Sequence, residues 1–467
     1  MSVTGDEKLD YGDDRRTRVR YRVMAFLCVL AFLTYFDRIC IMRAQGDIQR
    51  DLGLSDAEMG LVFGAFSLAY ALFEIPSGWL GDRFGARGAL TRIVLAWSIF
   101  SAATGAATGF VTLWTYRFLF GVGEAGAFPN MARIQSRWLA ARTRGRAGGL
   151  LWLTARWGGA FSPLIFGTIL RGVGALHARG FLVHVSAWRV GFWVSGMLGA
   201  VWVVSFYPWF RDDPADVAAV NRRELEFIHA GRGADAGHRH AAAGVWRALF
   251  TSGSLWAIAL LYFSGGFGWS FFMSWMPRFL KEVHHVKFEN SELMNAMPLF
   301  FGGMSCLSGG WLSDKLVKRI GRKKLGRAVF PVSGYITAAV AMFCIRYVHT
   351  PGQAVVLMCV AAGAFDFGQG ANWATIVDIG GRFAGSAAGF INMVGNMAGF
   401  LQPVIGAMIF NRFGWNALFA VYSGAFLVAS CMWAFIDPNR TFYETTSEDL
   451  TAETQGTQRI EEVVSGR

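Results

Sequence analysis

The stretch GWLGDRFGAR, from Gly78 to Arg87, has a near-copy later in the chain: GWLSDKLVKR, from Gly310 to Arg319. Both copies read Gly-Trp-Leu-x-Asp followed by a base, and both lie between two long apolar runs. Chance seldom places such a pattern twice in the same setting. The second half of the chain therefore repeats the first, and the apolar runs around the two copies decide the fold.

The composition is that of a protein that crosses a membrane many times. Hydrophobic residues make up 54% of the 467 positions and charged residues only 16%, too few to cover a soluble protein of this length. The excess of 44 Lys and Arg over 32 Asp and Glu falls in loops, where bases orient membrane proteins, so we expect no nucleic-acid partner. The six cysteines fall inside apolar runs as small hydrophobes, which predicts neither a metal nor another cofactor.

Twelve apolar segments are long enough to cross a bilayer, which takes about 20 residues of helix. One long polar stretch, 211–247, separates them into two sets of six. The predicted fold is an all-α polytopic membrane protein with twelve transmembrane helices in two pseudo-symmetric six-helix halves, 22–210 and 248–437, flanked by polar tails, 1–21 and 438–467. The predicted spans begin near Val23, Ala57, Ala89, Val111, Ala147, Trp188, Ser254, Glu292, Ala328, Gln353, Phe383 and Trp415.

Basic residues set the predicted orientation. They concentrate in the loops after the second, fourth, eighth and tenth spans, whereas a loop on the other side, around Asp47, Asp51, Asp56 and Glu58, is net acidic. The base-rich side of a cell membrane is the cytoplasmic one. We therefore expect an integral protein of the plasma or inner membrane with both tails in the cytoplasm. Both copies of the repeated stretch then lie on cytoplasmic loops, as in an internally duplicated transporter.

The first copy resembles the loop signature G-x-x-x-D-[RK]-x-G-[RK]-[RK] of the major facilitator superfamily of transporters. The residues that match the signature are Gly78, Asp82, Arg83, Gly85 and Arg87. Ala86 departs from it, because the signature usually has a base at that position. The resemblance implies that this loop is a cytoplasmic gate motif that holds the two halves together.

A narrower resemblance, to the anion:cation symporter family, covers nearly the whole chain. It rests on YFDR (35–38) in the first span, RFLFGVGEAGAFPN (117–130) in the fourth and SWMP (274–277) in the seventh. The fourth-span stretch is the most specific of these. That family includes bacterial sugar-acid transporters, so the resemblance implies a transporter of small organic anions and protons rather than an enzyme.

Charged residues interrupt the apolar spans of the N-terminal half at five positions: Asp37, Arg38, Arg117, Glu124 and Arg156. Each such charge costs at least about 2.5–3.5 kcal/mol near the membrane centre. Chains rarely keep so many of these costs without a use, so we expect the five side chains to line a polar cavity. The alternative is that they pair with one another as structural salt bridges.

Helical geometry predicts the depth and the direction of these charged side chains. Arg38 and Arg117 fall at similar depth, about 6–9 Å below the outer surface, where two guanidinium groups could bind one carboxylate. Glu124, two turns after Arg117, lies about 10 Å deeper, near the midplane, where desolvation favours binding of a proton. Asp37 adjoins Arg38 but points about 100° away from it.

The family resemblance implies roles for the same positions. Arg38 and Arg117 would bind the substrate's carboxylate, with Tyr35 of the YFDR stretch beside them. Asp37 and Glu124 would carry or sense the driving proton. Arg156 matches no position of the family pattern: it either gives a dianion a second cationic contact or neutralises Glu124, and we favour the second.

The C-terminal half holds fewer charges within its spans, and Asp366, either charged or protonated and hydrogen-bonded, is the clearest. Neutral polar and aromatic residues there suit the hydroxyls and the apolar face of a sugar-like substrate, although Asn and Gln also join membrane helices. We place Trp373 and Asn392 first, because the resemblance puts substrate contacts in the tenth and eleventh spans. Further candidate cavity residues are Tyr262, Asn372 and Asn396.

The sequence thus predicts a monomeric secondary active transporter that takes up an organic anion with protons by alternating access. A sugar acid such as a hexonate, hexuronate or aldarate is the favoured substrate; an aromatic acid, a dicarboxylate or anion exchange are the alternatives. A membrane-embedded transferase would need an intramembrane His or an acidic metal pair, and all eight histidines fall in loops. A nutrient sensor on the same scaffold would carry larger cytoplasmic extensions. No catalytic residue is predicted.

Overall fold

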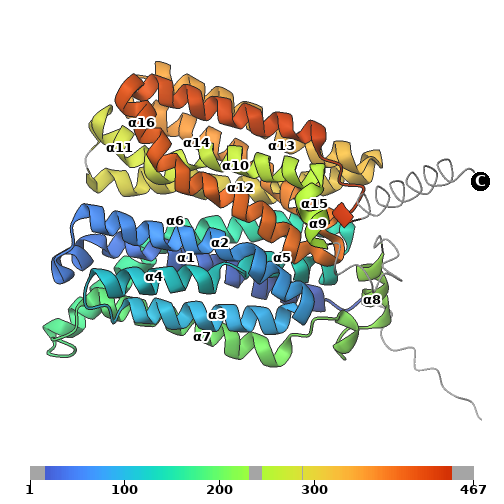
Figure 1. Ribbon diagram of the computed structural model, residues 1–467, viewed down its shortest axis with the longest axis horizontal. Helices are drawn as coiled ribbons and strands as arrows, with labels where there is room; N and C mark the ends of the chain where they lie inside the picture. Colours follow the sequence, from blue (N-terminus) through green and yellow to red (C-terminus); the bar gives the residue numbers. More distant parts are fainter. Residues whose placement is uncertain (1–15, 231–244, 287, 444–467) are drawn as a thin grey trace, which may run out of the picture.

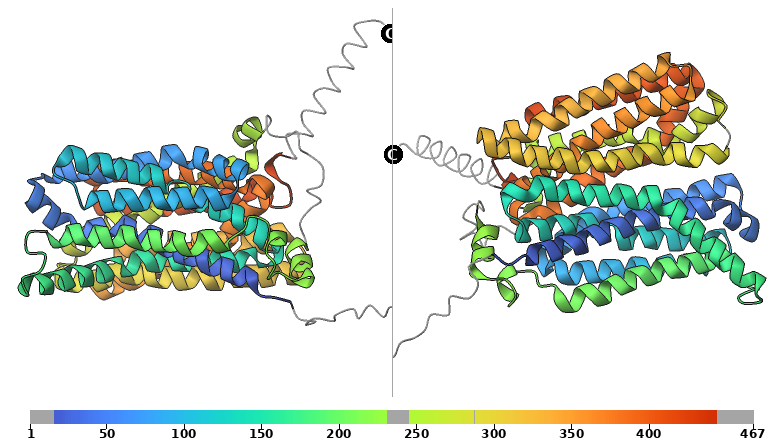
Figure 2. Two further views of the ribbon diagram at one scale, coloured as in Figure 1. Left: turned by 90° about the horizontal axis from the view of Figure 1, so that it is seen from below. Right: turned by 180° about the vertical axis from the view of Figure 1, so that it is seen from behind.

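The computed structural model describes residues 16–230, 245–286 and 288–443, and nearly all of that part of the chain is helical. The helices run along one axis and form two layers, the N-terminal helices in blue to green and the C-terminal helices in yellow to red (Figure 1). Both ends of the described chain lie at the same end of the bundle in every view (Figures 1 and 2). We call this end the tail end and the opposite one the loop end.

The helices follow one another along the chain with short connections. The first layer contains α1 (Val19–Leu52), α2 (Asp56–Phe84), α3 (Ala86–Thr104), α4 (Phe110–Glu124), α5 (Ala127–Trp138), α6 (Arg144–Ala178) and α7 (Ala187–Trp209). The short helix α8 (Arg222–His229) lies at the tail end, on the connection between the layers. The second layer contains α9 (Val245–Thr251), α10 (Gly253–Ser274), α11 (Met276–Glu282), α12 (Phe288–Ile320), α13 (Lys323–Cys344), α14 (Pro351–Phe367), α15 (Gln369–Gly380) and α16 (Ala384–Met432).

Three spans consist of two helices in line. α4 continues as α5 after the turn residues Ala125 and Gly126, α10 continues as α11 after Trp275, and α14 continues as α15 after Gly368. α16 makes two crossings, because Gly414 has φ 74° in its middle and the chain folds back there. The described helices therefore form twelve crossings.

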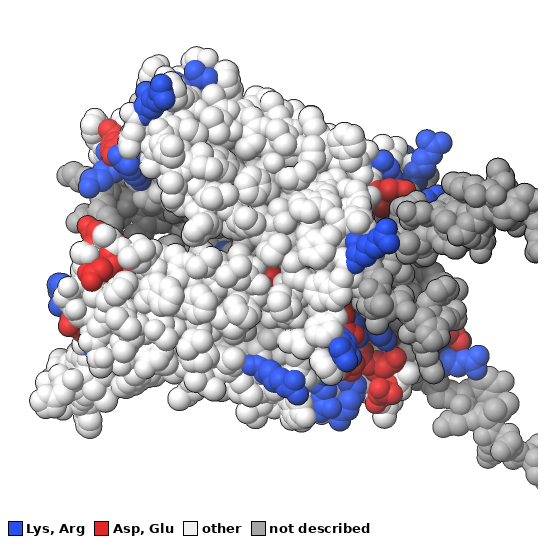
Figure 3. Space-filling model, viewed as in Figure 1, with Lys and Arg blue, Asp and Glu red and all other residues white. Residues whose placement is uncertain are grey.

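Twelve crossings in two sets of six, each starting within a few residues of its predicted position, confirm the predicted fold class. Seven helical segments of the described chain are long and apolar enough to span a membrane by length and composition alone. Charged side chains gather at the two ends, and the belt between them is nearly free of charge on the face shown in Figure 3. Exposed apolar side chains such as Leu61, Ile99, Val204 and Met408 suit contact with lipid tails.

The predicted tails and central loop fall partly outside the described residues, at 1–15, 231–244 and 444–467. The part of the central loop that is described packs against the start of α1. There, the buried Glu224 of α8 accepts hydrogen bonds from the backbone N–H groups of Val19 and Arg20 and pairs with the Arg20 guanidinium at 2.7 Å. The carboxylate thus caps the N-terminus of α1, where a negative charge is favourable.

Candidate functional site

A cavity of about 120 Å³ lies between the two layers and is lined from both by aromatic and polar side chains. Tyr35 in its wall stands near the middle of α1, so the cavity is about midway along the bundle. The predicted site residues that line it are Tyr35, Arg38, Arg156, Tyr262, Asn392 and Asn396. The other predicted site residues lie outside the lining of this cavity: Asp37, Arg117, Glu124, Asn372 and Trp373.

Arg38 and Glu124 form an ion pair at the wall of the cavity. Arg38 Nε donates to Glu124 Oε1 at 2.6 Å, and the Glu124 side chain is fully buried whereas that of Arg38 is 16% exposed. The Arg38 Cζ atom also lies 4.1 Å from the ring centroid of Tyr70. The Arg38 guanidinium group thus lines the cavity, and one of its buried nitrogen atoms, Nη2, has no hydrogen-bond partner.

The break after α4 places Glu124 at this depth. The sequence GVGEAG has no bulky side chain around the carboxyl, and the helix ends at Glu124 before the turn to α5. A Cβ on Gly126 would come within 2.6 Å of Ser77 Cβ on α2, so only glycine allows this close approach. Glycines on this span therefore serve helix packing, as small residues commonly do in membranes.

Arg117 and Asp37 lie behind the lining. Arg117 is 2% exposed, and its Nε and Nη1 have no hydrogen-bond partner. The ring of Phe66 lies 5.3 Å from Arg117 Cζ and 5.4 Å from Arg38 Cζ, so it contacts both guanidinium groups. The two arginines predicted to bind one carboxylate do not meet around the cavity in this structure. Asp37 is buried close to Arg117 and away from the lining, in line with its predicted direction.

Arg156 pairs with Asp366 across the two layers. Its Nε and Nη2 bind both carboxylate oxygens, at distances from 2.8 to 3.2 Å, and its Cζ lies 3.8 Å from the Trp269 ring centroid. The expectation that Arg156 neutralises Glu124 is wrong. Glu124 forms its ion pair with Arg38 instead, and Arg156 pairs with Asp366, which α14 contributes from the opposite layer.

The two candidates on α15 lie in the layer of side chains behind the lining. Trp373 is fully buried, donates from Nε1 to Gln135 Oε1 at 3.0 Å and meets the ring of Trp152 edge to face. Asn372 donates to the Tyr335 hydroxyl at 2.9 Å and accepts from Trp433 Nε1 at 3.2 Å. In this state both residues reach the cavity only through neighbours that line it.

Neutral polar groups complete the wall. Asn396 on α16 donates to Glu74 Oε2 on α2 at 3.0 Å, which joins the layers. The Tyr262 hydroxyl and Gln369 Oε1 are buried without hydrogen-bond partners. Sequence reasoning missed Tyr70 in the lining, because its position depends on how α2 is rotated about its axis.

The first copy of the repeated stretch joins the two layers at the tail end. Asp82 of α2 accepts from the backbone N–H groups of Gly385 and Ser386, at 3.2 and 2.6 Å, and pairs with Arg133 at 2.9 Å. Gly385 and Ser386 begin α16, so the carboxylate caps a helix of the opposite layer. A Cβ on Gly78 would come within 2.3 Å of the Gly385 carbonyl oxygen, which explains the glycine. We call this contact the first latch.

The other gate-motif residues support the loop itself. Gly85 has φ 93° and ends α2, which favours glycine at this position. Arg87 donates from its backbone N–H to Asp212 at 3.1 Å and from its guanidinium to the Tyr207 carbonyl oxygen. Arg83 lies with its Cζ 5.2 Å from the Trp79 ring centroid. These contacts stay within the first layer and the segment that follows it.

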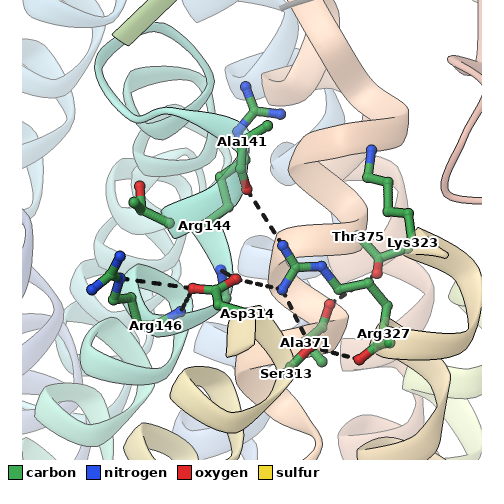
Figure 4. A network of polar contacts seen from close by, with 12 residues as sticks. Ala141, Arg144, Arg146, Ser313, Asp314, Lys323, Arg327, Ala371 and Thr375 are labelled. Carbon is green, nitrogen blue, oxygen red and sulfur yellow. Dashed lines mark hydrogen bonds and ion pairs between the residues drawn. The ribbon is translucent and has the colours of Figure 1, made fainter. Parts of the chain in front are cut away.

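The second copy makes the equivalent contact from the other layer, which we call the second latch (Figure 4). Asp314 of α12 accepts from the backbone N–H groups of Gly145 and Arg146, at 3.0 and 2.8 Å, and pairs with Arg327 at 2.7 Å. Gly145 and Arg146 lie in the first turn of α6, in the opposite layer. A Cβ on Gly310 would come within 2.2 Å of the Gly145 carbonyl oxygen. The two copies of the repeated stretch thus make the same kind of contact between the layers, one from each half.

A further ion pair adds to the closure at the tail end: Arg144 and Asp378 lie 2.6 Å apart across the layers. At the loop end, a recess separates the layers on the face shown in Figure 3. Two duplicated bundles around a cavity, closed at one end and recessed at the other, are the architecture of a secondary transporter.

The comparison with known families agrees. The model of the Major Facilitator Superfamily matches residues 27–403, and the chain belongs to that superfamily. It is therefore an integral membrane transporter and not an enzyme.

The chain is similar to several known transporters over almost the full length of both proteins. A probable sulfoacetate transporter of Cupriavidus necator is 30% identical over 91% of this chain and 95% of its own. A probable galactarate/D-glucarate transporter of Escherichia coli is 30% identical over 89% and 94%. A hexuronate transporter of Bacillus subtilis is 28% identical over 88% and 92%. Among solved structures, a proton:xylose symporter superposes with a TM-score of 0.68 at 15% identity, covering 92% of this chain and 98% of its own.

Proposed function

We propose that the protein is a secondary active transporter that takes up an organic anion together with protons by alternating access. The observation that carries the proposal is the pair of Arg38 and Glu124, a cation that lines the cavity and is held at 2.6 Å by a buried carboxyl group. Relatives that are similar over nearly the whole chain carry the names of sulfoacetate, galactarate or D-glucarate and hexuronate transporters. Sugar acids are therefore the favoured substrates.

In this proposal, Glu124 holds Arg38 while the cavity is empty. A proton that binds to Glu124 neutralises the carboxylate, and Arg38 then exchanges this partner for the carboxylate of the substrate. The number of buried charges stays balanced, which matters because an unbalanced charge near the membrane centre costs at least about 2.5–3.5 kcal/mol. The proton and the anion therefore cross together.

Arg117 and Asp37 extend the same machinery. Arg117 has two buried nitrogen atoms without hydrogen-bond partners, and the ring of Phe66 touches both its guanidinium group and that of Arg38. A shift of Phe66 would let both arginines bind one carboxylate, as the sequence predicts. Asp37, buried near Arg117, then balances the second cation.

Neutral groups would bind the rest of a sugar acid. The Tyr262 hydroxyl and Gln369 Oε1 lack hydrogen-bond partners, and Asn392 and Asn396 line the same wall, so hydroxyls of the substrate would find both donors and acceptors. Trp373 would take part through Trp152, against which it packs.

Alternating access would use the two latches. Opening of the first and second latch would expose the cavity at the tail end, while the recess at the loop end closes. Bases near the tail end, such as Arg137, Arg142 and Lys324, support a cytoplasmic position of both termini in a plasma or inner membrane. One chain encloses a complete cavity, which supports a functional monomer.

Uptake into proteoliposomes tests the proposal. The purified protein is reconstituted, and radiolabelled D-glucarate, D-glucuronate and D-gluconate are added with and without an inwardly directed proton gradient. We expect accumulation above the outside concentration that a protonophore abolishes. Uptake that ignores the gradient but needs an anion inside would replace symport by exchange. No uptake of any acid by folded protein would contradict an organic-anion transporter.

A further inference from the structure

We propose that Arg156 and Asp366 form a second anion subsite with its own proton-binding carboxyl group, so that the preferred substrate is an organic dianion with an acid group at each end. The inference rests on the proposed function of the cavity as an anion-binding site, and it names the substrate class of that site. A hexarate and a short sulfonate-carboxylate both have this chemistry.

The two halves carry equivalent buried carboxyl groups. Glu124 is the last residue of α4, directly before the break to α5, and Asp366 is the last but one of α14, directly before the break to α15. α4–α5 and α14–α15 are the fourth crossings of their halves. Each half thus carries one buried carboxyl group at the break of its fourth crossing. Each of these carboxyls binds one arginine that lines the cavity.

Asp366 has one cation and few other titratable groups around it. Its side chain is fully buried, and the titratable groups that face it are Arg156 of α6, the thiol of Cys306 on α12 and the phenol of Tyr335 on α13. Arg156 is the one cation paired with it among the described residues. A Cβ on Gly302 of α12 would lie 2.3 Å from Asp366 Oδ2, so a larger residue at this position would collide with the carboxylate.

Arg156 shares one cavity with Arg38 of the first subsite. Arg38, Arg156 and Tyr35 all line the cavity. The Tyr35 ring centroid is 5.2 Å from Arg38 Cζ, and its ring meets that of Trp152, which is 5.3 Å from Arg156 Cζ. A substrate that spans Tyr35 would therefore present one acid group to each arginine.

Charge balance then sets the coupling. Each arginine is matched by one carboxylate while the cavity is empty. A dianion brings two negative charges, and one proton on Glu124 and one on Asp366 restore the balance. Transport of a dianion is then electroneutral with two protons, whereas a monoanion bound at Arg38 needs one.

A purely structural pair would behave differently. Arg156 and Asp366 join the two layers, so their loss would weaken the fold whatever the substrate. The readout must therefore be a preference between substrates. D-glucarate and D-gluconate suit it, because they share a hydroxylated six-carbon skeleton and differ in having two or one carboxylate groups.

The experiment measures initial uptake of both acids into proteoliposomes under an inward proton gradient. The test variant is Arg156→Gln/Asp366→Asn, which leaves no unpaired charge. The control is Arg144→Gln/Asp378→Asn, which removes an ion pair between the same layers at the tail end, together with the contact of Asp378 with the partly exposed Lys323. We expect the D-glucarate to D-gluconate ratio of the test variant to fall about tenfold or more, because a hydrogen bond to a charged group contributes about 1.5–3 kcal/mol. The control ratio stays at the wild-type value.

A second variant, Asp366→Asn, keeps the cation and removes its proton site. D-glucarate should then enter with one proton and a net negative charge, so that an inside-positive potential set with valinomycin and potassium stimulates its uptake, whereas wild-type uptake ignores the potential. An unchanged ratio in the double variant, or wild-type uptake of D-gluconate without D-glucarate, overturns the dianion subsite and leaves the proposed function standing. Uptake of neither acid by the wild type overturns both.

Discussion

The two halves of the molecule share one plan and differ in where the cations come from. Each half contributes a latch aspartate, Asp82 or Asp314, and a carboxyl group at the break of its fourth crossing, Glu124 or Asp366. Glu124 binds an arginine of its own half, whereas Asp366 binds Arg156 of the other half.

The difference shows how duplication can produce an asymmetric site. The arginines that line the cavity, Arg38 and Arg156, both come from the first layer. The second layer contributes Tyr262, Gln369 and neutral amides to the lining, and Asp366 as the partner of Arg156. The closing contacts are closely similar in the two halves, whereas the cavity has a cationic wall on one side and a mostly neutral wall on the other.

The largest expected effect concerns stability. Arg156→Gln leaves Asp366 buried without a cation, which costs about 3–5 kcal/mol. Arg38→Gln leaves Glu124 with a second cation nearby, because Arg117 also acts on it, so the loss should be smaller. Thermal unfolding of both variants in detergent compares the two halves directly. Equal losses would show that Arg117 gives Glu124 no compensation.

The next effect concerns transport. Arg38→Ala should lower uptake of every acid about a hundredfold, because it removes a charged hydrogen-bond donor at the first subsite. Arg50→Ala, at an exposed arginine of the loop end paired with Asp47, is the control and should transport normally. Initial uptake of D-gluconate measures the loss. If D-gluconate uptake survives in Arg38→Ala, the first subsite lies elsewhere.

The two latches should contribute about equally to keeping the tail end closed. Asp82→Asn and Asp314→Asn each weaken the cap of a helix N-terminus in the opposite layer, an effect of about 0.3–2 kcal/mol. Each also leaves a cation, Arg133 or Arg327, without its carboxylate partner. Both should shift the population towards opening at the tail end to a similar extent. Distances between spin labels on α3 and α13 report this opening. An effect from Asp82 alone would mean that the second copy is only a packing contact.

The smallest effect tests the neutral wall. Tyr262→Phe removes a buried hydroxyl that has no hydrogen-bond partner in the protein, and it should raise the KM for D-glucarate about two- to tenfold. Sulfoacetate has no hydroxyl groups, so its uptake should keep the wild-type KM. Equal effects on both substrates would place the Tyr262 hydroxyl away from the bound sugar chain.

Much of the fold could be predicted because hydropathy and duplication are local signals. The spans followed from runs of apolar residues, and the paired copies around Asp82 and Asp314 placed the halves in register. Arg38 was found because a charge inside an apolar span is conspicuous. The direction of Asp37, away from Arg38, followed from the helical turn.

The rest depended on contacts between the layers, which a single sequence does not encode locally. Arg156 was matched to Glu124, although α14 delivers Asp366 to it. Trp373 looked like a cavity residue, but α15 is turned so that its indole donates to Gln135 behind the wall. Helix rotation and the approach of opposite halves decide such cases, since a shift of one residue changes the face by about 100°.

The most direct test of the central claim is the Glu124→Gln variant. Glutamine has the size of glutamate but cannot carry the proton, so Arg38 stays available for an anion. The account predicts that the variant still exchanges radiolabelled D-gluconate across proteoliposomes loaded with the same acid, but no longer accumulates it in response to an inward proton gradient. Gradient-driven accumulation equal to that of the wild type would contradict the claim that the Arg38–Glu124 pair couples the anion to the proton.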